Sequence, residues 1–189
     1  MQELISNILP GLAGMPNLHP MVVHFPIALL SSFLLLEFLS IFLKSESLKT
    51  GATWMLYLGT LGTVVAVLAG FRAAGAVGHD EAVHAIMETH EHLGLTVLLI
   101  SIVLSLWRIL TAGRLKGTLR LIYLALAVIM VITMSFGADY GGLMVYTHGV
   151  GIKGMESSEG AAHGQSAEEV NKTPQEIEKA EHDSTPHKH

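Results

Sequence analysis

The sequence predicts an all-α integral membrane protein, a four-helix bundle with a disordered hydrophilic C-terminal tail. Half of the 189 residues are hydrophobic and only 14% are charged, against roughly 25% in soluble domains. Four apolar runs of about 18 to 25 residues are each long enough to cross a bilayer core of roughly 30 Å. A soluble fold would have too little polar surface to cover four such helices.

The four predicted spans cover residues 21–43, 53–77, 93–110 and 119–136. In the first span, Pro20 suits the first helical turn, where a missing N–H removes no hydrogen bond. Pro26 lies deeper in that helix and frees the carbonyl of residue 22, so we expect a local distortion near His24. The polar segment 78–92 has a helical pattern, so the third helix should extend beyond the membrane.

Glycines crowd the segment after the fourth span, at positions 137, 141, 142, 149, 151 and 154. Such glycine pairs break helices and allow tight turns. We therefore expect the fourth helix to end near residue 136. The apolar loop beyond it should fold back over the outer mouth of the bundle and bring Tyr146 and His148 there; an irregular, solvated loop is the alternative.

Two domains are expected, a four-span transmembrane domain at residues 1–152 and a tail at residues 153–189. The tail is rich in Glu, Lys, Ser and His without a sustained apolar face, which predicts disorder. The formal net charge of −5 excludes a basic nucleic-acid footprint. The absence of cysteine excludes disulfides, thiolate metal sites and thioether-attached haem.

The distribution of cations predicts the orientation in the bilayer. Six of the seven Lys and Arg residues before residue 153 flank the first and third connectors, namely Lys44, Lys49, Arg108, Arg114, Lys116 and Arg120. Because cationic residues resist translocation, both connectors should be cytoplasmic. Both termini and the segment 78–92 should then lie on the outer, periplasmic side.

Histidines gather on that outer side. Seven of them precede the tail and all are expected there, namely His19, His24, His79, His84, His90, His92 and His148. An even-numbered bundle returns to its starting side, so these side chains should meet at one mouth. Because an imidazole is costly in hydrocarbon and is a common metal ligand, His24 is a candidate ligand. A hydrogen bond that packs two helices together is the alternative for His24.

Further candidates lie near the same mouth. His84, Glu88 and His92 follow at i, i+4 spacing and share one helical face, which suits a metal site, a hydrogen-bond relay or a solvated face. His92 begins the third span, and Gly94 after it permits close approach of a flat group or a helix. Arg72, a cation inside the second predicted span, needs an anion, for which Asp139, Glu88 or a haem propionate is suited.

Glu37 is the one acid inside the first span, and it lies nearer the cytoplasmic side. The sequence leaves its state open. It could be protonated, bonded to Tyr57, Thr60 or Thr63 of another helix, or directed toward Lys44.

The motifs LHPMVVHFPIALL, EHLG and GGLMVYTHGVGI, together with the four spans, resemble a family of bacterial membrane proteins known as domain of unknown function 2231. The resemblance runs from residue 17 to residue 152, and the His-Pro-x-x-x-His-Phe-Pro opening is its most specific part. It places His19, His24, His92, Tyr146 and His148 at recurring positions of the family. Because relatives are joined to cytochrome c or Rieske-like domains, the resemblance implies a redox module of the bacterial inner membrane.

The leading functional hypothesis is a membrane electron-transfer subunit that holds a non-covalent b-type haem near the periplasmic face. His24 and His92 are the expected axial pair, and Arg72 the partner of a propionate. His19, His148 and Tyr146 would surround the cofactor or bind a second one. A quinone or a periplasmic cytochrome or Rieske partner, within a hetero-oligomer, would exchange electrons with it.

Two other hypotheses stay open. The same histidines could handle or sense copper or zinc without a porphyrin, with His84 and Glu88 as further ligands. The protein could also be a membrane anchor without a cofactor. No nucleophile–base pair or phosphate loop supports hydrolysis, so a redox subunit is expected rather than an independent enzyme.

Overall fold

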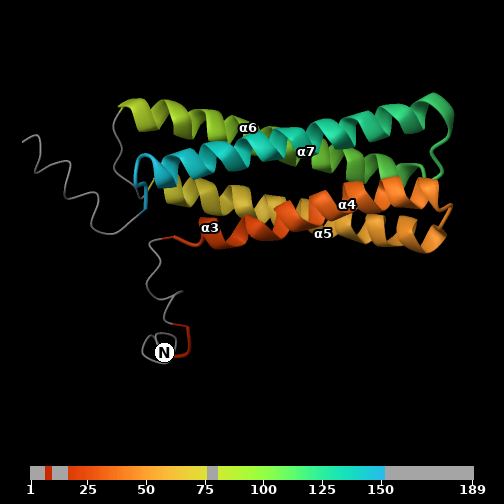
Figure 1. The fold of residues 1–189 in the computed structure, drawn as a ribbon, viewed down its shortest axis with the longest axis horizontal. Helices are drawn as coiled ribbons and strands as arrows, with labels where there is room; N and C mark the ends of the chain where they lie inside the picture. Colours follow the sequence, from red (N-terminus) through yellow and green to blue (C-terminus); the bar gives the residue numbers. More distant parts are fainter. Residues whose placement is uncertain (1–6, 10–16, 76–80, 152–189) are drawn as a thin grey trace, which may run out of the picture. The chain divides into compact units, whose positions relative to one another are not determined.

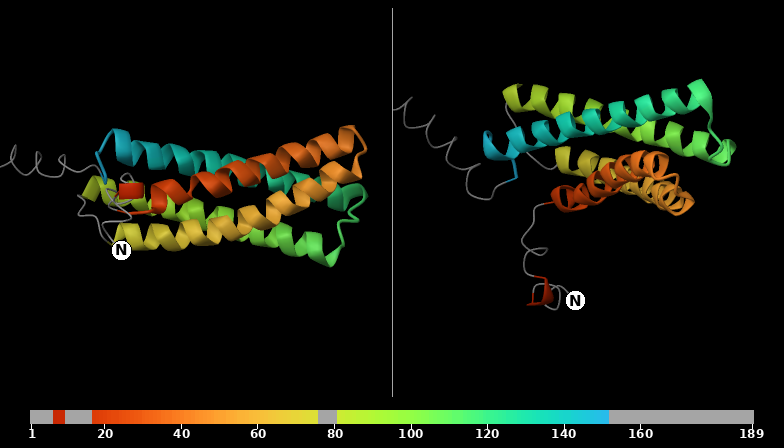
Figure 2. Two further views of the ribbon diagram at one scale, coloured as in Figure 1. Left: turned by 90° about the horizontal axis from the view of Figure 1, so that it is seen from below. Right: turned by 45° about the vertical axis from the view of Figure 1, so that its right-hand side comes forward.

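A computed structural model of the chain describes residues 7–9, 17–75 and 81–151. Its helices are α3 (His19–Val22), α4 (His24–Phe42), α5 (Glu46–Ala74), α6 (Glu81–Leu110) and α7 (Gly117–Tyr146). Figures 1 and 2 show the four long helices side by side, with the α4–α5 and α6–α7 connectors at the same end. The all-α bundle is therefore confirmed, and these helices belong to one compact unit that ends at Gly151. The predicted tail and His79 lie outside the described residues.

Four helical stretches are long and apolar enough to cross a membrane, namely His19–Phe42, Glu46–Ala74, Val83–Leu110 and Gly117–Tyr146. The shortest has 24 residues, about 36 Å at 1.5 Å per residue, which exceeds the hydrocarbon thickness. Large apolar side chains face outward along all four, with Leu35, Leu61, Leu99 and Ile132 each at least half exposed. A continuous apolar surface of this kind is suited to lipid.

The first span is interrupted at Val23, between α3 and α4. Pro26 has no N–H to donate to the carbonyl of Val22, and its ring crowds that carbonyl. The backbone N–H of Ile27 still reaches the Val23 carbonyl at 3.3 Å, so the helix resumes at once. The distortion expected next to His24 is therefore present.

Buried positions recur at intervals of seven residues, or a multiple of seven, along each long helix. They are Pro26, Phe33 and Ser40 in α4; Ala52, Gly59 and Ala66 in α5; Val83, Val97 and Leu104 in α6; and Tyr123, Met130, Gly137 and Met144 in α7. This spacing keeps one seam of each helix facing its neighbours and is typical of left-handed bundles. The core therefore runs as a narrow column along the bundle.

The two helical hairpins, α3–α5 and α6–α7, repeat one another with an offset of 71 residues. Ser45 and Lys116, which are 71 positions apart, immediately precede α5 and α7. Further pairs with this offset are fully buried in both hairpins, namely Phe33 with Leu104, Ala52 with Tyr123, and Leu56 with Ala127. Because α4 contacts α7 and α5 contacts α6, the hairpins are arranged as an approximate two-fold relation requires.

The bounds of the third and fourth helices differ in part from the sequence prediction. The third helix begins at Glu81, so its expected extension beyond the apolar span is confirmed. The expected end of the fourth helix near residue 136 is wrong, because α7 continues through Gly137, Gly141 and Gly142 to Tyr146. A short turn at residues 147–151 follows α7, and the expected loop beyond it lies outside the described residues. Gly137 and Gly141 do not form a turn; both contact His90 of the neighbouring helix α6.

Candidate functional site

His19 occupies the first turn of α3 and is partly buried, at the end of the bundle opposite the α4–α5 and α6–α7 connectors (Figure 1). Its backbone N–H donates to Oδ1 of Asn17 at 3.2 Å, which orders the entry into the helix. Its ring Nδ1 lies 2.9 Å from the carbonyl oxygen of Ala66 in α5. Since a carbonyl oxygen only accepts, Nδ1 carries the proton and donates it.

His90 occupies the matching position in α6. Its ring Nδ1 donates to the carbonyl oxygen of Gly137 in α7 at 2.8 Å. In both hairpins the histidine and its carbonyl partner are 47 residues apart in the sequence. The two imidazoles are thus held by the same device in the two repeats.

A glycine stands beside each ring. A Cβ atom added to Gly70 would lie 3.1 Å from Cε1 of His19, and one added to Gly141 would lie 3.3 Å from Cε1 of His90. Both distances are tighter than ordinary carbon contacts. Gly70 and Gly141 are again 71 positions apart, so each repeat reserves this space for its imidazole.

The two imidazoles meet across the bundle. Their ring centroids are 5.9 Å apart and the ring planes are nearly perpendicular, at 86°. Because each neutral ring uses its Nδ1 proton on a carbonyl, its Nε2 keeps a lone pair. Metal-bound histidines commonly use this arrangement, in which the second ring nitrogen donates to a carbonyl and fixes the tautomer.

The centroid distance is in the range that would let both imidazoles hold one metal ion. With metal–nitrogen bonds of about 2 Å, two imidazoles on opposite sides of an ion have centroids roughly 6 Å apart. A Cβ atom added to Gly94, one turn after His90 in α6, would meet no other atom within 4 Å. A larger group could therefore approach α6 at Gly94. Two neutral imidazoles with free Nε2 lone pairs are the donor set of a bis-histidine haem.

The structure places the expected axial pair elsewhere. His24 and His92 are both exposed. His92 lies two residues beyond His90, so its side chain projects from a different face of α6. His84 and Glu88 are also exposed on α6.

The remaining expected site residues lie at the same end of the bundle as the two imidazoles. Arg72 is exposed in the last turn of α5, two residues after Gly70. Tyr146 ends α7 and is 89% exposed. His148 is partly buried just beyond that helix. Among the described residues, no group of three or more His, Cys, Asp or Glu side chains is placed to hold a metal ion.

Comparison with protein families decides the relationship. The family described as "Predicted membrane protein (DUF2231)" matches residues 15–154. The chain belongs to this family. The match spans α3 to α7 and includes both His19 and His90, and it confirms the resemblance inferred from the sequence motifs. No curated protein and no solved structure matches the chain.

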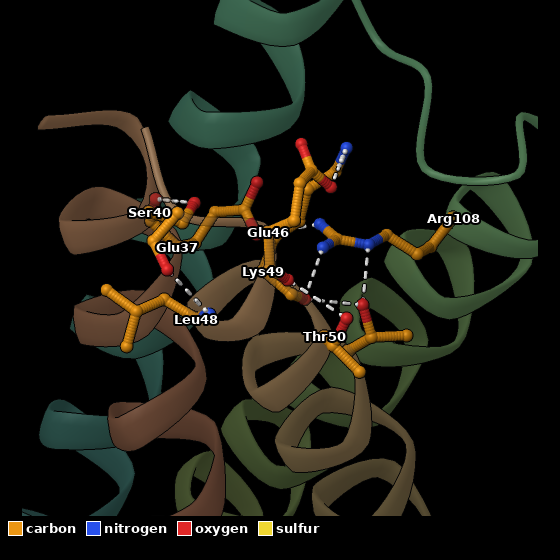
Figure 3. Close-up of polar contacts among 9 residues, drawn as sticks. Glu37, Ser40, Glu46, Leu48, Lys49, Thr50 and Arg108 are labelled. Carbon is orange, nitrogen blue, oxygen red and sulfur yellow. Dashed lines mark hydrogen bonds and ion pairs between the residues drawn. The ribbon is translucent and has the colours of Figure 1, made fainter. Parts of the chain in front are cut away.

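In this DUF2231 member a second polar cluster lies toward the opposite end of the bundle (Figure 3). Nη1 of Arg108 in α6 lies 2.7 Å from Oε2 of Glu37 in α4, and both side chains are almost fully buried. Arg108 also donates to the hydroxyl of Thr53 at 3.1 Å and to the carbonyl of Lys49 at 3.0 Å. Glu37 and Arg108 are 71 positions apart, so they are equivalent residues of the two repeats.

The sequence did not identify the partners of two residues in this cluster. Arg108 lies beside the third connector, as expected, but it is buried and supplies the cation that Glu37 needs. The partners considered for Glu37 were Tyr57, Thr60, Thr63 and Lys44, and none of them pairs with it in the structure. Instead, Thr60 contacts the Ser105 hydroxyl at 2.9 Å, and Thr63 donates to the Gly59 carbonyl.

The spacing of buried residues contains the signal for His90. His90 lies seven residues after Val83 and seven before Val97, both buried, so it belongs to the inner seam of α6. His19 precedes the buried Pro26 by the same interval. A spacing of seven residues selects this pair of histidines, whereas a spacing of four from His84 selects an exposed face of α6.

Proposed function

We propose that this membrane protein is an electron-transfer subunit that holds one b-type haem, with His19 and His90 as axial ligands. The observation that carries the proposal is the matched pair of imidazoles, each anchored through Nδ1 to a carbonyl and 5.9 Å from the other. The two-fold relation of the hairpins supports a ligand shared between them. The exposed His24 and His92 are poorer candidates, because neither is held by a buried partner among the described residues.

Haem fits this donor set better than a bare ion. A porphyrin supplies four nitrogen ligands itself, so two protein ligands complete the iron. Zinc sites usually take three or four protein ligands, and no cluster of that size occurs in the described part of the chain. Copper or zinc bound by the two imidazoles alone is the second candidate.

The protein's own groups would tune such a site in defined ways. The Ala66 and Gly137 carbonyls orient the rings and increase the basicity of Nε2, while Gly70 and Gly141 leave room for the rings. The exposed guanidinium of Arg72 near this mouth suits a propionate. A haem bound there would supply reversible one-electron exchange with a quinone or a periplasmic carrier.

The test is spectroscopic. We would express the full chain in bacterial membranes, purify it in detergent and record reduced-minus-oxidised spectra together with elemental analysis. The proposal predicts a Soret band that is lost in His19→Ala and in His90→Ala but kept in His24→Ala and His92→Ala. Stoichiometric copper or zinc without a Soret band would favour the second candidate, and neither signal would leave a cofactor-free anchor.

The proposed orientation places the two imidazoles at the periplasmic face of the bacterial inner membrane. The connectors that carry most of the cations lie together at the other end of the bundle, as the positive-inside rule requires of a cytoplasmic end (Figure 1). A reporter that is active only in the cytoplasm should be silent when fused after His189. Strong activity of that fusion would reverse the orientation.

A further inference from the structure

A polar cavity lies at the connector end of the bundle, far from the imidazole pair along the helices. Its volume is about 230 Å³. The two connectors and all four long helices contribute to its lining. The charged side chains among the lining residues are Glu37, Lys44, Glu46, Lys49, Arg108 and Arg120.

The charges in this lining do not balance. Glu37 pairs with Arg108 at 2.7 Å, and Glu46 pairs with Lys49 at 3.3 Å. No ion pair of residues 17–75 and 81–151 involves Lys44 or Arg120. Within those residues, two positive charges on separate hairpins therefore have no acidic partner, and both line one cavity.

The backbone at the start of α5 places Lys44 beside the cavity. Lys44 follows α4 in the left-handed backbone region, at φ 51°, where the chain turns into α5. Ser45, also in the lining, caps α5 by accepting the N–H of Leu48 at 3.4 Å. The cavity thus lies at the amino end of a 29-residue helix, the end at which the helix dipole favours anions.

We propose that this cavity binds a phosphate-bearing anion, supplied either by the headgroup of an anionic phospholipid or by free phosphate. Basic pockets between transmembrane helices at the cytoplasmic side are suited to lipid phosphates. The cavity adjoins the lipid-facing helix ends and is large enough for a phosphate group. Lys44 and Arg120 supply the charge, while the buried Arg108 shapes the floor through its bonds to Glu37 and Thr53.

The test compares two charge-matched double variants of the full chain. Lys44→Gln with Arg120→Gln removes both unpaired charges from the lining. Arg114→Gln with Lys116→Gln removes two exposed cations at the same end of the bundle that do not line the cavity. The midpoint of thermal unfolding is measured in neutral detergent with short-chain phosphatidylglycerol, short-chain phosphatidylcholine or inorganic phosphate, at constant ionic strength.

Phosphatidylglycerol or phosphate should raise the midpoint of the wild type and of the Arg114/Lys116 variant by roughly 5 °C at saturation, and phosphatidylcholine should not. The Lys44/Arg120 variant should need about tenfold more of the same ligand, as the loss of roughly 1.4 kcal/mol of binding would imply. A shift with phosphatidylglycerol alone identifies lipid as the source, and an equal shift with phosphate identifies the free anion. Equal weakening in the two variants, or no shift with either ligand, would overturn the proposal.

Discussion

At the scale of single residues, the ion pair of Glu37 and Arg108 is the most consequential polar contact of the membrane domain. Removing one partner of a buried pair leaves an uncompensated charge, which costs about 3–5 kcal/mol. We therefore expect Glu37→Gln to lower the free energy of unfolding in detergent by about that amount. Glu46→Gln, which breaks an exposed pair, should cost less than about 1 kcal/mol. Equal effects of the two changes would contradict the structure.

Removing the Tyr123 hydroxyl should have the opposite effect on stability from breaking the Glu37–Arg108 pair. Its ring is fully buried against Phe33 and Trp107, with ring centroids 6.3 and 6.0 Å away. No hydrogen bond within the described part of the chain satisfies its hydroxyl, although the Arg108 guanidinium lies 5.8 Å from the ring centroid. Tyr123→Phe removes only that hydroxyl and should leave the free energy of unfolding unchanged or higher, whereas Tyr123→Ala should cost about 3–5 kcal/mol. A large loss in Tyr123→Phe would reveal a bond that the hydroxyl makes.

Residue types were predicted from the sequence more easily than residue partners. The abundance of histidine at the outer end and the need of Glu37 for a partner both follow from composition and position. Which imidazoles meet depends on helix rotation, and a shift of two residues along α6 turns the side chain to another face, from His90 to His92. Arg108 was missed for a related reason, because a cation near a helix end is usually drawn outward to the interface.

At the scale of helices, the glycines beside the imidazoles have a measurable role. In Gly70→Ala the new Cβ would lie 3.1 Å from His19, so the ring must shift. We expect a lower haem content per protein and a weaker Soret band in this variant. Gly51→Ala on the same helix is the control, because its Cβ would meet Leu36 at an ordinary 3.5 Å.

Gly51→Ala should keep the cofactor and raise the free energy of unfolding by up to about 1 kcal/mol through helix propensity. If Gly70→Ala also kept full haem content, the role of Gly70 as a spacer would be wrong.

The end of the fourth helix could not be predicted from local sequence, and the glycines of α7 show why. Local propensity predicts a break at Gly137, Gly141 and Gly142, yet α7 passes through all three. Tertiary contacts override the propensity, because the Gly137 carbonyl accepts from His90 and Gly141 makes room for its ring. Such contacts join residues almost fifty positions apart, so no local sequence window contains them.

At the scale of the whole molecule, the repeat of 71 residues predicts that the two halves can exchange roles. The charge swap Glu37→Arg with Arg108→Glu should recover much of the stability that either single change loses. Recovery should be incomplete, since the position matching Thr53 is Leu124, which has no hydroxyl. The free energies of unfolding of the two single variants and the swap test this. Losses that simply add would show that the hairpins are not equivalent around the pair.

Low-temperature electron paramagnetic resonance of the oxidised, purified protein tests the central claim most directly. Two axial imidazoles with nearly perpendicular planes, as in the 86° pair of His19 and His90, leave two iron d orbitals almost equal in energy. The account predicts a strongly anisotropic low-spin haem signal that disappears in His19→Ala and His90→Ala and persists in His24→Ala and His92→Ala. A low-spin signal that instead survives in the first two variants and is lost in the second two would contradict it.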